Sequence, residues 1–141
     1  MTPCKDCPWS RAITPSARKD TLGGSRPEVY VGQIMLSFWL PCHNSPKYCD
    51  KASNVNEVSQ CVGAATFRSN IGLTRAQIPE PLLLLPENHE LVFSTLAEFY
   101  AHHKCYQLSD AVKILTPQKV AEFVFRQATD PNVRMQLKRR E

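Results

Sequence analysis

The chain has 141 residues, of which 43% are hydrophobic and 21% are charged, and its formal net charge is +4. These values are typical of one ordinary globular domain and exclude a chain that is disordered throughout. No apolar run approaches the roughly 18 residues that a membrane span needs, and the polar start lacks the apolar core of an export signal, so we expect a cytoplasmic protein that binds no membrane.

The first motif in the chain is a pair of cysteines, Cys4 and Cys7, followed directly by Pro8 and Trp9. Two thiolates at this spacing can bind one metal ion, because a tight turn directs both sulfurs inward and leaves backbone N–H groups to donate to them. We call residues 4–9 the knuckle. A knuckle supplies half of a tetrahedral metal site, so further ligands must come from elsewhere in the chain.

The next strong signal is the apolar run VYVGQIMLSFWL over residues 29–40, which follows a polar connector. Its β-branched and aromatic residues, its short length and Gly32 predict a buried strand. Cys42 and His43 come directly after Pro41 at the end of this run. A strand would therefore hold both of them beside the knuckle.

Helical spacing begins near Asn54, continues to a stop at Asn70 and Gly72, and places Cys61 on the inward face. A proline-rich stretch over residues 72–88 follows and is expected to be extended. Further helices are then predicted in the second half of the chain, over about 87–103, over 109–115, from Pro117 after the cap Thr116, and after Pro131.

These elements together predict an α+β fold. It would consist of a metal-centred lobe over residues 1–75, with a short strand or hairpin, and a mainly helical part over residues 76–141 packed on it within one compact domain.

Six cysteines could form three disulfides in a secreted protein, but in a reducing cytosol clustered cysteines more often bind metal. Zinc takes four Cys or His ligands, and Cys4, Cys7 and Cys61 with either Cys42 or His43 meet that number. Neighbours on a strand point to opposite faces, so one of the last two would ligate, and Cys42 is narrowly preferred. Cys49 is left as a spare ligand. The same thiolates could hold a [4Fe-4S] cluster, which is the alternative cofactor.

A second pair of metal-binding residue types occurs near the end of a predicted helix. His102 and Cys105 are three residues apart and share a face, with His103 and His89 nearby. They could form a second metal site, but a helix end with a dipole-compensating histidine and a buried cysteine is favoured.

Most of the positive charge excess lies in the first part of the chain, where residues 1–51 hold seven Lys and Arg against four Asp and Glu. Clustered cations of this kind indicate an anionic partner such as nucleic acid. The residues predicted to contact a partner are Arg11, Arg18, Lys19, Arg26, Arg68 and Arg75. No Ser-His-Asp triad, phosphate-binding loop or paired carboxylates are recognisable, so no catalytic residues are predicted and a binding or regulatory protein is favoured. A zinc or iron–sulfur enzyme that acts on nucleic acid or senses redox state is the alternative.

Three phrases of the sequence, CKDCPWSR, LPCH and QCVGAATFR, resemble a family of small uncharacterised proteins of phages and actinobacteria. That family has a Cys-x-x-Cys-Pro-Trp-Arg opening, a later Cys-His pair, and a Cys-x-Gly before an alanine-rich helix. The resemblance implies that Cys4, Cys7, Cys61 and either Cys42 or His43 share one site, in which Pro8 and Trp9 pack. Ser10 stands where the family has arginine, which comes one residue later as Arg11. The resemblance implies no activity, but it suggests a phage-encoded, zinc finger-like regulator or inhibitor that binds nucleic acid or a host protein in the host cytoplasm.

Overall fold

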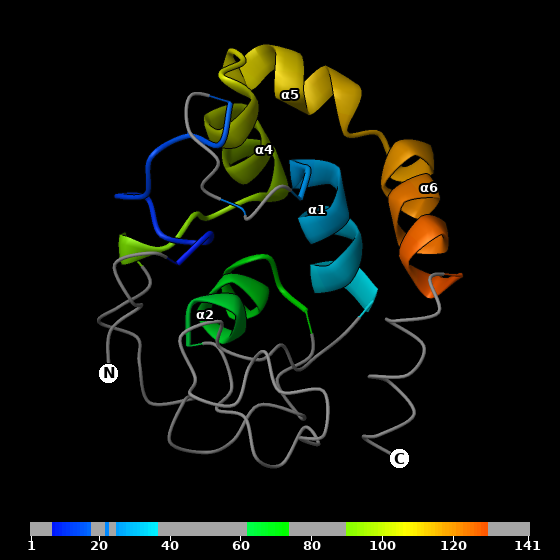
Figure 1. Cartoon of the computed structure of the whole chain (residues 1–141), viewed down its shortest axis with the longest axis horizontal. Coiled ribbons are helices and arrows are strands. Elements are labelled where there is room, and N and C mark those ends of the chain that lie inside the picture. Colours follow the sequence, from blue (N-terminus) through cyan, green and yellow to red (C-terminus); the bar gives the residue numbers. More distant parts are fainter. Residues whose placement is uncertain (1–6, 18–21, 23–24, 37–61, 74–89, 130–141) are drawn as a thin grey trace.

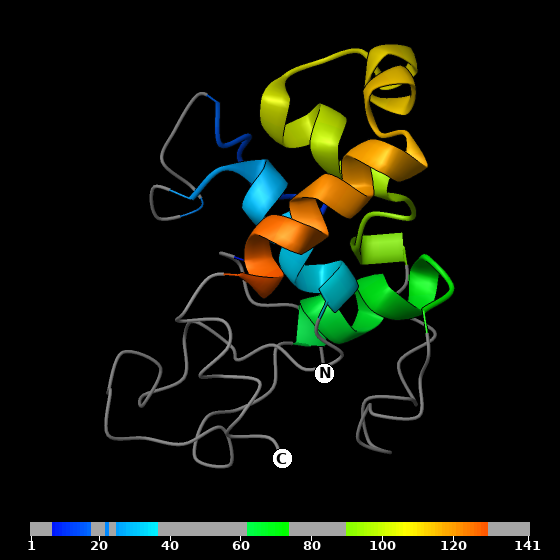
Figure 2. The same ribbon diagram turned by 90° about the vertical axis from the view of Figure 1, so that its right-hand side faces the viewer.

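The computed structural model describes residues 7–17, 22, 25–36, 62–73 and 90–129 of the chain. These residues contain five α helices, namely α1 (Pro27–Leu36), α2 (Val62–Asn70), α4 (Leu96–Lys104), α5 (Leu108–Ile114) and α6 (Pro117–Ala128). Helix α1 packs against α6 and α4, and α5 packs against α4 (Figure 1). In Figure 2 the orange α6 crosses in front of α1, and the green α2 lies beside the carboxyl end of α1. None of the described helices is long and apolar enough to cross a membrane.

The strand predicted over residues 29–40 is wrong, because its described part lies in helix α1. Within the described ranges the only β pairing is an isolated antiparallel bridge between Ser10 and Val92. The described part is therefore helical, and the predicted α+β class is wrong as well.

The apolar character of α1 explains this error. Val31 and Ile34 are fully buried, and Pro27 and Gly32 are buried as well. A helix that is covered on several sides carries apolar residues around much of its circumference, so the 3.6-residue period that marks an exposed helix is missing from its sequence. The signal that was available is Pro27, since proline is favoured in the first turn of a helix.

The close contact between α1 and α6 depends on Gly32. A Cβ atom placed on Gly32 would lie 2.5 Å from the carbonyl oxygen of Phe123 and 2.6 Å from Cγ of Gln127. Both distances are far below ordinary van der Waals contact, so only glycine lets the backbones approach this closely. The contact fixes how the middle of α1 faces the second half of α6.

The helices of the second half follow the sequence prediction more closely. Helix α6 begins at Pro117, and the Thr116 hydroxyl accepts the Lys119 N–H at 3.2 Å, which confirms the predicted cap. Helix α5 lies within one residue of its predicted bounds. Helix α4 begins at Leu96, nine residues later than predicted. The residues before it pair instead with the chain start, since the Phe93 N–H donates to the Trp9 carbonyl at 3.1 Å.

An aromatic stack forms the centre of the core. The Trp9 ring stacks on those of Phe67 and Phe99, at centroid distances of 4.8 Å and 4.7 Å and tilted by less than 30° from each, and the two phenylalanine rings lie 5.9 Å from each other. Phe67 and Phe99 are fully buried, and Trp9 is 2% exposed. Residues from both sides of the predicted boundary at residue 75 therefore share one core.

Helix α4 ends in a backbone conformation that does not suit its residue. Cys105 has φ 57° and ψ 39°, in the left-handed region, and its N–H and that of Tyr106 cap the last carbonyls of the helix. A side chain costs about 1 to 2 kcal/mol in this region, and glycine does not bear that cost.

We therefore expect Cys105→Gly to stabilise the protein by about 1 kcal/mol. Urea denaturation followed by circular dichroism measures this gain. Cys105→Ala keeps a Cβ atom and is the matched control, for which no gain is expected. Equal midpoints for the two variants would contradict the explanation.

Candidate metal centre

The second cysteine of the knuckle lies in a tight, buried turn. Cys7 is fully buried, and its carbonyl oxygen accepts the Ser10 N–H at 3.1 Å, which closes the turn around Pro8 and Trp9. Proline presets the backbone for such a turn, and the buried tryptophan anchors the turn in the core. The sequence Cys-Pro-Trp thus fixes the position of the Cys7 sulfur.

That sulfur lies against the first turn of helix α2. A Cβ atom placed on Gly63 would lie 2.1 Å from Cys7 Sγ and 3.5 Å from Trp9 Cβ. Glycine is therefore required for the sulfur to occupy this place. In the sequence, Gly63 is two residues after Cys61, another predicted ligand. The amino-terminal end of a helix bears partial positive charge, which favours a negatively charged sulfur.

The remaining predicted ligands are outside the part of the chain that the structure describes. These residues are Cys4, Cys42, His43, Cys49 and Cys61. Of the predicted ligands, the structure therefore describes Cys7 alone.

A buried histidine supports the knuckle from helix α4. His103 is fully buried, and its Nε2 atom lies 2.9 Å from the Pro8 carbonyl oxygen, while Nδ1 accepts the Ser16 N–H at 3.3 Å. An oxygen that only accepts and an N–H that only donates fix a neutral ring with its proton on Nε2. The Ser16 hydroxyl donates in turn to the His103 carbonyl at 3.1 Å. His103 thereby ties α4 to this turn and to the segment that follows it.

Protonation of His103 is disfavoured by its surroundings. Burial lowers its pKa to about 4, the charge of His102 acts in the same direction, and the hydrogen bond to Pro8 only partly opposes them. An unfolded chain, with a histidine pKa near 6.5, binds the proton more tightly, so the stability from this residue is present above pH 6.5 and is lost as the pH falls toward 4.

We expect the free energy of unfolding to fall by about 3 kcal/mol between pH 7 and pH 4 on account of His103. Urea denaturation at half-unit pH steps measures this fall. In His103→Gln the stability should be lower at pH 7 and much less dependent on pH over that window. A variant with the same pH dependence as the original chain would contradict the assignment.

The predicted pair His102 and Cys105 does not act together in the structure. His102 Nε2 lies 2.6 Å from the carbonyl oxygen of Ile13, and Cys105 is exposed at the helix cap. Cys105 is therefore not the buried cysteine that the sequence favoured; the buried member of the cluster is His103. Among the described residues, no group of three or more His, Cys, Asp or Glu could hold a metal ion.

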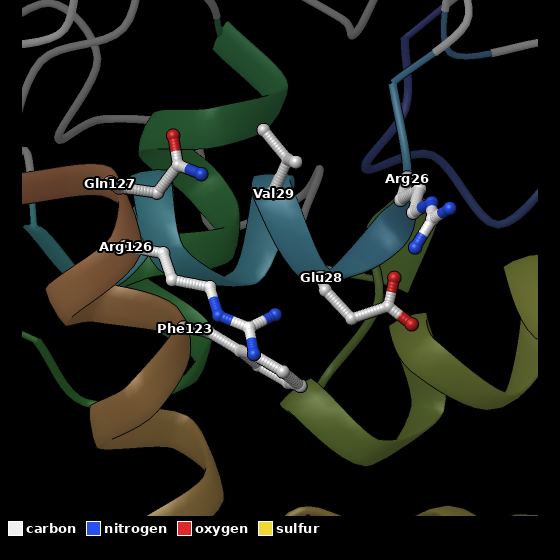
Figure 3. Close-up of a pocket in the computed structure, with 6 residues that line it drawn as sticks. All are labelled: Arg26, Glu28, Val29, Phe123, Arg126 and Gln127. Carbon is white, nitrogen blue, oxygen red and sulfur yellow. The ribbon is translucent and has the colours of Figure 1, made fainter. Parts of the chain in front are cut away.

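Three of the six predicted contact cations are described, and two of them act within the molecule. Arg11 donates to the Glu90 carbonyl at 2.8 Å, to Ser94 Oγ at 2.6 Å and to Glu98 Oε1 at 3.1 Å. Arg68 is buried and donates to the Ile34 carbonyl at the end of α1. Arg26 lines a small cavity between α1 and α6 (Figure 3). Arg18, Lys19 and Arg75 lie outside the described ranges.

Comparisons with models of protein families, with curated protein sequences and with solved structures found no match. The resemblance to the phage and actinobacterial family therefore stays a prediction, and the case for a metal centre depends on the geometry around Cys7.

Proposed function

We propose that the protein is a small metal-binding module, in which the thiolates of Cys4, Cys7 and Cys61 hold one zinc ion. The fourth ligand is Cys42 or His43. The observation that carries this proposal is the contact of the Cys7 sulfur with Gly63 at the start of α2.

The covalent chain makes this contact informative about Cys61. In the sequence, Cys61 precedes by only two positions the glycine that Cys7 touches, which supports the proposal that both cysteines bind the same ion. The missing side chain at Gly63 leaves the space that the Cys7 sulfur occupies, and any larger residue at position 63 would fill that space.

The surroundings of Cys7 favour a structural centre over a catalytic one. Cys7 is part of the same buried apolar cluster as Trp9 and Phe67. A catalytic zinc keeps one position open to water and substrate, whereas structural zinc is closed by four protein ligands, most often cysteines. A closed centre would fix the knuckle to α2 and stabilise the fold around it.

The proposed role of the module is to bind another protein rather than nucleic acid. Phosphate contacts need cations that are not already bound within the protein, and of the three described contact cations Arg11 and Arg68 donate to groups of this chain, which leaves Arg26. Binding to a host protein should then depend weakly on salt, while a steep loss of affinity from 50 to 200 mM salt would instead indicate nucleic acid.

Elemental analysis of anaerobically purified protein tests the centre directly. We expect one zinc per chain and a colourless protein, with loss of the zinc in Cys7→Ser and in Cys61→Ser. Cys105→Ser removes an exposed thiol outside the proposed site and is the matched control, which should keep its zinc. Brown protein that contains iron and acid-labile sulfide would show that the same thiolates hold an iron–sulfur cluster instead of zinc. Protein without any metal would contradict the proposal.

A further inference from the structure

His103 bonds to one particular peptide group of the turn that begins at Cys7. The Cys7 carbonyl oxygen accepts the Ser10 N–H at 3.1 Å, so Pro8 and Trp9 are the two central residues of this turn. The Nε2 atom of His103 lies 2.9 Å from the Pro8 carbonyl oxygen, which belongs to the peptide group between these two residues. The histidine therefore contacts the central peptide of the turn.

The closing hydrogen bond of a β-turn does not determine which way its central peptide faces. Turns of types I and II differ by a rotation of about 180° of this peptide, and proline in the first central position suits both types. The bond to His103 selects the orientation in which the Pro8 carbonyl faces helix α4. The peptide is trans, so its N–H, which belongs to Trp9, points in the opposite direction, away from His103.

The His103 ring is itself held firmly enough to fix this orientation. It is fully buried, its centroid lies 4.8 Å from that of Phe99, and its Nδ1 atom accepts the Ser16 N–H at 3.3 Å. Since Nδ1 accepts, Nε2 carries the proton and donates to the turn. The ring cannot rotate without leaving buried polar groups unpartnered, which is unfavourable.

The Trp9 N–H is a buried donor that needs an acceptor. Trp9 is 2% exposed, and its carbonyl oxygen accepts the Phe93 N–H, but no hydrogen bond joins its own N–H to any residue that the structure describes. Buried backbone N–H groups are almost always hydrogen-bonded. A side-chain acceptor commonly binds the N–H two residues further along the chain, and Cys7 stands in that relation to Trp9.

We propose that His103 is a positioning residue of the metal centre, which turns the Trp9 N–H toward the thiolate of Cys7. The inference rests on the proposed function, because a metal-bound thiolate accepts hydrogen bonds well and a neutral thiol only weakly. His103 does not bind the ion itself, since both of its ring nitrogens are engaged by Pro8 and Ser16. The N–H···S bond orients the sulfur and strengthens its hold on zinc.

Competition with a zinc chelator tests this role in the whole protein. We expect His103→Leu, which removes the donor but is similar in size, to bind zinc about 10- to 100-fold more weakly than the original chain. His103→Gln keeps an amide donor within reach of Pro8 and should restore most of the affinity. Tyr100→Phe removes another hydrogen bond of α4, the one to Glu28, and is the matched control, whose zinc affinity should equal that of the original chain.

Replacement of zinc by cadmium-113 gives a readout that a purely structural role of His103 would not change. Nuclear magnetic resonance should show scalar coupling between the Trp9 amide proton and the metal nucleus, transmitted through the N–H···S bond. The coupling should be absent in His103→Leu and present in Tyr100→Phe.

Three results would overturn the role of His103 while leaving the metal centre in place. One is a cadmium-loaded original chain without the coupling, which decides the matter even where His103→Leu does not fold. The others are a coupling that persists in His103→Leu, and a zinc affinity of that variant equal to that of Tyr100→Phe. An original chain that binds neither zinc nor cadmium would instead contradict the metal centre itself.

Discussion

Replacement of Gly63 by alanine is expected to displace the Cys7 sulfur from helix α2 and to abolish metal binding. The added methyl carbon would lie 2.1 Å from Sγ, well inside the normal contact distance of 3.5 to 4.0 Å. Neither side can yield easily, because Gly63 lies in a helix and Cys7 is fully buried in a closed turn. We expect the zinc content to fall from one per chain to near zero.

The same variant should lose about 1 to 3 kcal/mol of stability from overpacking alone, and more through the lost metal. Gly32→Ala is its matched control, since it introduces the same methyl group against the backbone of Phe123 at 2.5 Å. It should be destabilised to a similar degree but keep one zinc per folded chain. Elemental analysis and thermal unfolding of both variants make the comparison. Full zinc content in Gly63→Ala would contradict the placement of the ligand.

Removal of the Trp9 ring is the second change with a large expected effect. Trp9→Ala should lower the free energy of unfolding by about 3 to 5 kcal/mol, because the ring is 2% exposed and stacks on both Phe67 and Phe99. The near-ultraviolet circular dichroism of the stack should decrease with it. Urea denaturation measures the change in stability.

Tyr106→Ala serves as the control for the Trp9 substitution. Tyr106 is also aromatic, but 44% of its surface is exposed, so its loss should cost about 1 kcal/mol or less. A Trp9→Ala variant that is no less stable than Tyr106→Ala would show that the stack does not hold the core together.

Local capping chemistry made much of the second half predictable from the sequence. The pair Thr116 and Pro117 marks the start of α6 because a hydroxyl acceptor and a fixed φ both favour a first helical turn. Helix α1 also begins at a proline, but Arg26 before it has no hydroxyl acceptor, and the buried surroundings of α1 remove the periodicity that distinguishes a helix from a strand. The helical conformation of α1 is stabilised by the close contact of Gly32 with α6, and the sequence around α1 does not show this tertiary contact.

The candidate metal site divides in the same way. The knuckle could be proposed from the sequence because its cysteines are close in the chain, and its metal-binding role stays a prediction. The role of His103 could not, because its hydrogen bond to Pro8 joins residues that are 95 positions apart. Nor does the sequence around Arg68 indicate that its guanidinium faces the end of α1 inside the protein.

The stack of Trp9 on Phe67 and Phe99 also has a consequence for how the protein is made. The three rings come from the beginning, the middle and the second half of the chain. During translation at about 5 to 20 residues per second, the knuckle is synthesised roughly 5 to 20 s before Phe99 exists to cover it. For the proposed zinc centre, this means that the thiols of the knuckle are open to metal or to oxidation for several seconds on each nascent chain, and we expect the yield of zinc-loaded protein to depend on the zinc supply during synthesis.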